Sequence, residues 1–327
     1  MASPTDKAST FLNMALEHAF PKDYDPTLHQ LDYQTRDNEV VDYDMYELKQ
    51  KPGFRFRGPA ADPDGDAPFF SCVGAAQTFG CYVQRIYPHI LSDKLGMPAL
   101  NLALGTAGPR FYAASQELID LINKSEFLVV QVMSGRSEPN SRFTAVGSIE
   151  VLHDKIHDDN VSSAHAWTRI RKEEPGEVER YIAETRRSWI ENHRSFLARV
   201  KVPTVLLWLS SRQMDPSVDL DAPTVSEFMG LFPQFIDRKS FDEVAAMCDV
   251  AIESYSDRNA NHQLISRFTG KPAIVDFSVL NPEMKGVVET HNAYYPSPEM
   301  HEDAAELLLA ALEKLKLPSR ARLKADH

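Results

Sequence analysis

A short stretch in the first quarter of the chain has the outline of a nucleophile-bearing turn. Residues 69–80, FFSCVGAAQTFG, combine an apolar run that stops at a glycine with a polar turn that leads to a second glycine. Many hydrolases hold a catalytic serine at such a junction, because the turn exposes one side chain at the edge of a sheet. Here Ala75 and Ala76 fill the turn, and neither side chain can act as a nucleophile. The binding candidates that remain in this turn are Gly74, Ala76, Gln77 and Thr78.

A second polar segment follows the apolar run 127–133 and reads SGRSEPNS. The Arg136 guanidinium has the geometry to bind a carboxylate, sulfate or phosphate with two hydrogen bonds. The alternative is a purely structural role, as a hydrogen-bonded loop that closes the top of the sheet. Because loops at strand ends are where sites form, we expect ligand contacts here from Ser134, Arg136, Ser137, Glu138 and Asn140.

Near the C-terminus, two histidines flank the sequence NAYYPSPEM. His291 stands beside Asn292 and close to Tyr295, so it is the better candidate for a general base. His301 falls near the start of the expected last helix. The alternative for each is a structural role, as a helix cap or a surface imidazole.

Three further motifs have weaker chemical readings. HDKIHDD (153–159) would place two histidines on one face of a helix, but no third ligand has a fixed spacing, so we predict a solvated lid and no metal. GTAGPR (105–110) offers a backbone anion site at a helix start, or simply a tight turn around Gly105. FRFRGP (54–59) predicts an edge strand with Arg55 and Arg57 paired to nearby acids.

The elements that position these residues alternate along the chain. Continuous apolar runs separated by helical patterns are typical of a parallel sheet covered on both faces. The expected strands are 68–73, 98–104, 127–133, 203–211 and 272–278, and the expected helices are 8–20, 82–95, 111–125, about 176–200 and about 298–316. Loops after parallel strands converge at one edge, so the polar segments above should meet there.

Composition limits the classes of partner. The formal net charge is −12, from 35 Lys+Arg against 47 Asp+Glu, which disfavours a nucleic-acid binder. No signal peptide and no membrane-spanning run is evident, so we expect a cytoplasmic protein without a membrane partner. Three scattered cysteines, Cys72, Cys81 and Cys248, are expected to be reduced. No cofactor motif is evident.

At the strand ends the chain resembles the SGNH, or GDSL-type, hydrolase superfamily over about 68–133 and 272–316. Gly74–Gly80 resembles the Gly-Asp-Ser-x-Thr-x-Gly block, with Ala75 and Ala76 at the Asp and Ser positions. Asn101–Gly108 matches the block whose glycine, here Gly105, donates to the oxyanion hole. Ser137 stands where that family has an oxyanion asparagine, and Asn292 and Tyr295 stand at the Asp and His positions of its last block. The stretches GAAQTFG and QVMSGRS also resemble an uncharacterised bacterial family.

This resemblance implies a three-layer α/β/α sandwich whose usual catalytic triad is not used. The resemblance also implies that Tyr295 faces the pocket, where its hydroxyl can donate to a ligand. We expect an enzyme acting by transfer or hydrolysis on a small polar or carbohydrate-like substrate, with His291, Tyr295 and Arg136 as catalytic residues and the Gly105 backbone as oxyanion donor. The alternative is an inactive pseudo-hydrolase that binds a ligand or serves as a scaffold. The ligand class stays open between anionic and carbohydrate-like, and a homo-oligomer is not excluded.

We expect one domain with additions. Residues 1–66 form an N-terminal extension that wraps the core, and residues 67–317 form a single SGNH-like domain. Insertions are expected at about 148–200 and 213–246, the first as a loop or lid followed by a sheet-covering helix. Residues 318–327 are a basic tail.

Overall fold

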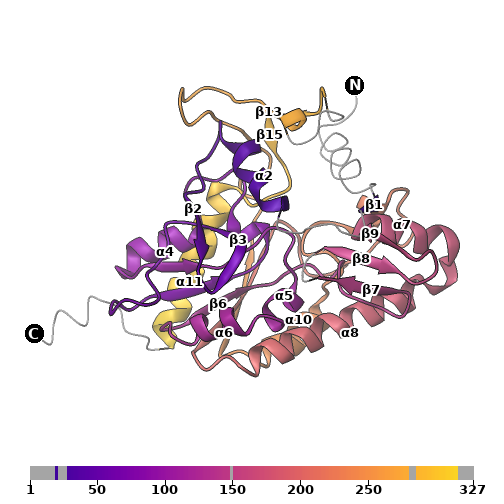
Figure 1. Ribbon diagram of the computed structural model, residues 1–327, viewed down its shortest axis with the longest axis horizontal. Coiled ribbons are helices and arrows are strands. Elements are labelled where there is room, and N and C mark those ends of the chain that lie inside the picture. The colour runs from indigo at the N-terminus through magenta and orange to yellow at the C-terminus, as the bar shows by residue number, and fades with distance from the viewer. Residues whose placement is uncertain (1–18, 21–27, 148–149, 280–284, 316–327) are drawn as a thin grey trace, which may run out of the picture.

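Two sheets, one of five strands and one of four, organise the chain (Figure 1). The computed structural model describes residues 19–20, 28–147, 150–279 and 285–315. Most of the helix expected over 8–20 lies outside the described residues, and its last two residues form the short strand β1 (Ala19–Phe20). The tail 318–327 also lies outside them.

The five-stranded sheet is parallel throughout, in the order β11-β10-β6-β4-β5. Its strands are β4 (Phe70–Val73), β5 (Ala99–Asn101), β6 (Leu128–Gln131), β10 (Thr204–Ser210) and β11 (Val250–Tyr255). Four of them confirm predicted strands. The prediction that 272–278 supplies the fifth is wrong, because β11 takes that edge. An edge strand alternates buried and exposed residues, as β11 does, and so lacks the continuous apolar run that marks the buried strands.

Helices cover both faces of this sheet, which confirms the α/β three-layer sandwich. Phe70 and Cys72 of β4 point into one apolar layer and Val73 into the other. The first layer packs against α4 (Tyr87–Leu95) and α11 (Pro298–Lys314). The second packs against α5 (Pro109–Ala113), α6 (Gln116–Ile122), α8 (Val178–Leu197) and α10 (Arg238–Ala245).

Two expected helices are shorter in the structure. The one expected over 82–95 starts only at Tyr87, because Pro88 occupies the first turn, where its fixed φ favours initiation. The one expected over 111–125 is divided into α5 and α6 around Ala114 and Ser115. The long helix near 176–200 and the last helix are confirmed as α8 and α11.

The four-stranded sheet is antiparallel, in the order β1-β9-β8-β7. It contains β7 (Phe143–Val146), β8 (Val151–Asp154) and β9 (Asp159–Ser162), and it is followed by α7 (Ser163–Glu173) and η1 (Pro175–Glu177). Apolar side chains of β7, β8, α7 and α8 form its own core, which includes Phe143 and Trp167.

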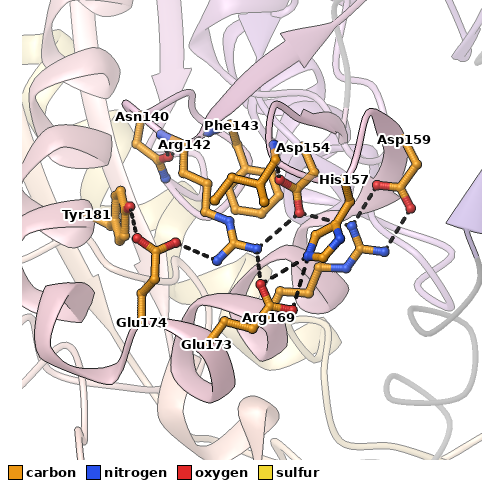
Figure 2. Close-up of polar contacts among 11 residues, drawn as sticks. Asn140, Arg142, Phe143, Asp154, His157, Asp159, Arg169, Glu173, Glu174 and Tyr181 are labelled. Carbon is orange, nitrogen blue, oxygen red and sulfur yellow. Dashed lines mark hydrogen bonds and ion pairs between the residues drawn. The ribbon is translucent and has the colours of Figure 1, made fainter.

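Ion pairs tie this second sheet to the helices below it (Figure 2). Arg142 lies between the fully buried Asp154, at 3.2 Å, and Glu174, at 2.7 Å, and also pairs with Glu173. Arg169 contacts the same Asp154 at 2.9 Å. Because Asp154 is buried, its charge depends on these two arginines.

The segment HDKIHDD belongs to this sheet and is not helical. His153 lies in β8 and bonds Asn160 at 3.2 Å, whereas His157 lies in the hairpin turn and contacts Glu173 at 3.0 Å. The two histidines therefore do not share a helix face, and the alternative of a metal pair is not supported.

The N-terminal segment contributes α2 (Leu28–Asp37) and an antiparallel hairpin of β2 (Met45–Leu48) and β3 (Lys51–Arg57). The strand predicted from FRFRGP is confirmed. The predicted acidic partner of Arg57 is wrong, because this buried guanidinium instead donates to four backbone carbonyls, those of Phe79, Gly80, Val83 and Gln84.

The remaining elements are short and lie mainly in loops after the strands. They are α3 (Ala76–Phe79), α9 (Val225–Met229), η2 (Phe277–Val279), β12 (His262–Gln263), β13 (Val275–Asp276), β14 (Val288–Glu289) and β15 (His291–Asn292). All three cysteines are free thiols. Among the described helices, none is both long and apolar enough to cross a bilayer. The predicted domain limits remain predictions.

Candidate functional site

A small cavity lies at the carboxyl end of the central sheet. Its volume is about 20 Å³, enough for about one water molecule. Its lining includes Gln77, Ser210, Ser211, Tyr294, Tyr295 and Met300. The turn after β4, the end of β10 and the turn before α11 thus meet where parallel sheets bind ligands. We call this cavity the strand-end pocket.

Two alanines occupy the start of the turn after β4. Ala75 precedes the single-turn helix α3, and Ala76 is its first residue. Ala76 is 7% exposed and packs in an apolar cluster that includes Tyr43 and Phe79. A methyl group therefore occupies the position where the resemblance predicts a serine.

Gly74 and Thr78 support this turn from behind. A Cβ on Gly74 would lie 2.6 Å from Thr78 Oγ1 and 2.7 Å from Gln131 Oε1, so only glycine fits there. The Gly74 N–H donates to the Tyr112 hydroxyl at 3.1 Å, and the Thr78 hydroxyl bonds that of Tyr87 at 3.0 Å. Both residues hold the turn in place, and neither is part of the pocket lining.

Gln77 is the polar side chain of the turn that reaches the pocket. It is 2% exposed, and its Oε1 has no hydrogen-bond partner in the described structure. Leaving a buried carbonyl unpaired costs about 1–3 kcal/mol, so buried groups of this kind are normally satisfied by water or a ligand.

Arg136 and Tyr294 form the polar edge of the site. Arg136 Nη2 contacts both carboxylate oxygens of Glu150, at 2.8 and 2.9 Å, and Nη1 donates to the Tyr294 hydroxyl at 3.2 Å. Burial lowers the pKa of Arg136, but the interactions with Glu150 and Tyr294 together raise it by more. The pKa therefore lies above its usual value, and the guanidinium stays charged. Gln234 Nε2 donates to the same hydroxyl at 3.2 Å. Because the Tyr294 oxygen accepts two hydrogen bonds, its own O–H is available to a ligand.

Asn292 shapes the turn that carries both tyrosines. Its Oδ1 accepts from the backbone N–H groups of Tyr294 (3.1 Å) and Tyr295 (2.9 Å), and its Nδ2 donates to the Tyr295 carbonyl (3.0 Å). These bonds form an Asx turn, which fixes the direction of the two rings.

Tyr295 lines the pocket and also faces the N-terminal segment. Its ring meets that of Tyr82 edge-on at 5.8 Å between centroids. Its hydroxyl interacts with the Tyr33 phenol and the Cys81 thiol. Burial raises the pKa of Tyr295 well above its usual value, so this phenol stays protonated and cannot replace a histidine base.

Gly105, the predicted oxyanion donor, is covered by Tyr33 of α2. A Cβ on Gly105 would lie 2.3 Å from Tyr33 Cε2, a distance that only glycine permits. Burial raises the pKa of Tyr33 above its usual range. The N-terminal segment thus occupies the space in front of the Gly105 backbone.

Glu138 lies behind this loop. Its buried carboxylate accepts from Asn192 Nδ2 at 2.5 Å and from the backbone N–H of Arg110, at the start of α5. Burial raises its pKa to about 7. The position of Glu138 is that of a capping carboxylate, at the edge of the site and not in the pocket lining.

The other residues of SGRSEPNS mostly stabilise their own loop. Ser134 Oγ accepts from the Arg136 N–H at 3.2 Å. Asn140 Oδ1 accepts from the N–H groups of Arg142 and Phe143, at 3.0 and 2.9 Å. Ser137 is half-buried. Of the five candidates in this segment, Arg136 makes the direct link to the pocket, through Tyr294.

The two candidate histidines lie away from the pocket lining. His291 is exposed, and its Nδ1 bonds the Thr290 hydroxyl at 3.0 Å. His301 is fully buried, its Nδ1 accepts from the Tyr87 N–H at 3.3 Å, and burial lowers its pKa to about 3. The structure does not bring His291 together with Arg136 and Tyr295.

Sequence reasoning missed four residues around this site. Tyr294 is adjacent to a candidate but carried no signal of its own, and Gln234, Glu150 and Tyr33 come from segments assigned to insertions or to the extension. Their proximity depends on contacts between distant parts of the chain. No cluster of three or more metal-binding side chains occurs in the described part of the chain.

A family model described as a domain of unknown function (DUF6473) matches residues 31–147. That range contains Tyr33, the turn after β4 and Arg136. No curated protein matches the chain.

A comparison with solved structures finds similarities at low identity. An acetyl xylan esterase from the rumen bacterium Butyrivibrio proteoclasticus is 10% identical, with 82% of this chain and 68% of that one covered and a TM-score of 0.40. A putative SGNH hydrolase from Slackia heliotrinireducens is 14% identical, with coverages of 74% and 97% and a TM-score of 0.34. A gut microbial diltiazem-metabolizing enzyme is 10% identical, with 76% of this chain covered and a TM-score of 0.39. The chain spans about half, 47%, of that enzyme.

Proposed function

We propose that this protein is an enzyme that binds a small polar, carbohydrate-like substrate at the strand-end pocket and acts by transfer or hydrolysis without a covalent serine. The observation that carries the proposal is a group of polar atoms in and beside this pocket that lack a hydrogen-bond partner. In the pocket lining, Gln77 Oε1 is buried without a partner and the Tyr294 O–H has no acceptor among the described residues. Behind Tyr294, outside the lining, Gln234 Oε1 is also buried without a partner. A native structure tolerates several such groups together mainly where a ligand or water completes them.

Charge favours a neutral substrate over an anionic one. Arg136 is already paired with Glu150, and Arg36 makes two hydrogen bonds to Asp37, at 2.5 and 2.8 Å. Arg212, next to the lining residue Ser211, donates to five backbone carbonyls. An anion would therefore meet guanidinium groups whose hydrogen bonds are already made to other groups of the protein, and it would lie near two buried carboxylates. Hydroxyl groups both donate and accept, so they match the amide and phenol groups around the pocket.

The proposed chemistry assigns the proton donor to Tyr294. The Arg136 guanidinium donates to the Tyr294 oxygen and so favours transfer of the phenol proton to a departing oxygen of the substrate. Arg136 is then a positioning residue that acts through Tyr294. Water, or a second substrate hydroxyl, would be the attacking group, because Ala76 supplies none, and the proton that it loses would return to the Tyr294 phenolate.

The test is a thermal-shift screen followed by turnover assays on each hit. The panel contains neutral and acylated sugars, their phosphorylated and uronic acid counterparts, nucleotides and acyl-CoA. A ligand at 100 times its Kd should raise the free energy of unfolding by about 2.7 kcal/mol. We expect neutral, hydroxyl-rich compounds to stabilise the protein and Gln77→Leu to abolish the shift.

Two adjacent tyrosines provide the matched control. Tyr294→Phe should reduce turnover at least tenfold, whereas Tyr295→Phe, whose hydroxyl meets Tyr33 and Cys81, should have a smaller effect. Binding without any turnover would favour the alternative, a ligand-binding or scaffold protein. Hits confined to anionic compounds would contradict the proposed substrate class.

A further inference from the structure

Tyr33 fills the space that a ligand would need in front of Gly105. A Cβ on Gly105 would lie 2.3 Å from Tyr33 Cε2 and 2.8 Å from its hydroxyl. The same ring lies 5.7 Å from that of Phe79 and packs against the apolar cluster that contains Ala76. One side chain of the N-terminal segment thus covers Gly105 and packs against the cluster that contains Ala76.

The end of α2 that follows Tyr33 is firmly held. Asp37 receives two hydrogen bonds from Arg36 and one, at 2.5 Å, from the Tyr43 hydroxyl. The Arg36 guanidinium also lies 5.0 Å from the Tyr82 ring centroid. Tyr33 is about one helical turn from this anchor, and the polar partner of its own hydroxyl is Tyr295.

The remaining cavity is too small for a substrate. Its volume of about 20 Å³ holds about one water, whereas pockets for small molecules usually measure at least 300 Å³. Figure 1 shows α2 near the top of the molecule, where it packs against β13, so its movement would not require the five-stranded sheet to open.

We propose that α2 is a gate for this site and that the Tyr33 ring is its closing element. Ligand enters when the part of the helix that carries Tyr33 moves away about the Arg36–Asp37 anchor. This inference rests on the proposed function, because it describes access to the same site. It explains why Gly105 is held close to Tyr33, whose hydroxyl meets that of Tyr295, a residue of the pocket lining.

The gate is tested by the accessibility of position 76. Ala76→Cys places a thiol in the cluster against which Tyr33 packs, in a Cys248→Ser background that removes the partly exposed native thiol. Iodoacetamide labelling is followed by mass spectrometry, and the fully buried Cys72 of β4 reports global unfolding. We expect Tyr33→Ala to increase labelling at position 76 at least tenfold, with Cys72 unchanged and Tyr33→Phe close to the parent protein.

Two results would overturn the gate. One is unchanged labelling at position 76 in Tyr33→Ala, and the other is an equal increase at position 76 and Cys72, which would mean general destabilisation. If Ala76→Cys does not fold, hydrogen exchange is measured instead on the protein that retains Ala76, with and without Tyr33→Ala, and it tests the same proposal. Tyr33→Ala should then speed exchange across 102–107 and leave β6 unchanged, and uniform or absent acceleration would reject the gate.

The outcome is independent of ligand identity, so the gate and the proposed function can fail separately. Faster labelling with no ligand found in the screen would keep the gate and reject the substrate. A hit with no effect of Tyr33→Ala on labelling would keep the site and reject the gate.

Discussion

Glu138 and Asn192 are joined by a 2.5 Å hydrogen bond between a buried carboxylate on the loop after β6 and an amide on α8. The same carboxylate accepts from the first turn of α5. One acidic group therefore connects three elements that support the candidate site, and it does so where its charge is poorly solvated.

This relationship predicts a pH dependence of stability. Burial raises the pKa of Glu138 from 4.5 to about 7, so between these values the native protein binds more protons than the unfolded chain. Its contribution to stability is therefore greatest below pH 4.5 and falls as pH rises to 7, by roughly 3 kcal/mol. In urea unfolding across this range, the stability of Glu138→Gln relative to the parent protein should increase as pH rises. The curve of stability against pH for Glu126→Gln, at an exposed position, should run parallel to that of the parent. A parallel curve for Glu138→Gln would contradict the prediction.

His193 should make the stability of the protein depend on pH in the opposite direction. It is fully buried, its Nδ1 bonds the Trp189 carbonyl at 3.0 Å, and burial lowers its pKa from 6.5 to about 4. The unfolded chain therefore takes up the proton first, and stability is lost as pH falls from 6.5 to 4, by roughly 3 kcal/mol. His193→Gln should reduce this acid loss and His291→Gln, at an exposed position, should not. Equal slopes for the two variants in calorimetry would reject the assignment.

Arg57 should be difficult to replace even by lysine. Its guanidinium is 1% exposed and donates to four carbonyls of the segment after α3, a geometry that an ammonium cannot reproduce. Arg57→Lys should lower the free energy of unfolding by about 2–4 kcal/mol, since buried carbonyls lose their donors. Arg55→Lys, at an exposed position in the same strand, should change it by less than about 0.5 kcal/mol. Chemical denaturation of both variants decides this, and similar midpoints would count against it.

Gly105 and Tyr33 should show strong energetic coupling. Gly105→Ala places a Cβ 2.3 Å from the Tyr33 ring and should cost about 1–3 kcal/mol, as overpacking does. In a Tyr33→Ala background the added methyl has room, so most of this cost should disappear. A double-mutant cycle by urea unfolding measures the difference, and an additive result would mean that the two residues are not in contact.

The central sheet follows from the sequence because strand signals are local. Continuous β-branched and aliphatic runs at 127–133 and 203–211 can be stable only when buried on both faces, which requires helices above and below. The turn at 74–80 without a nucleophile is visible for the same reason, since glycine spacing is a short-range property. The edge strand β11 was not predicted, because its exposed residues interrupt the apolar pattern.

The site itself was decided by tertiary structure. Tyr33 contacts Gly105, and Glu150 forms an ion pair with Arg136. The Tyr82 hydroxyl donates to Glu289, which lies more than 200 residues further along the chain. No periodicity or spacing encodes such pairs, because they depend on how separate elements pack and on which polar groups burial leaves without water. The sequence by itself determined a parallel α/β sheet with Ala75 and Ala76 in the turn after its first strand. Only the folded chain determined that Tyr294 lines the pocket, that His291 lies at the surface, and that Tyr33 covers Gly105.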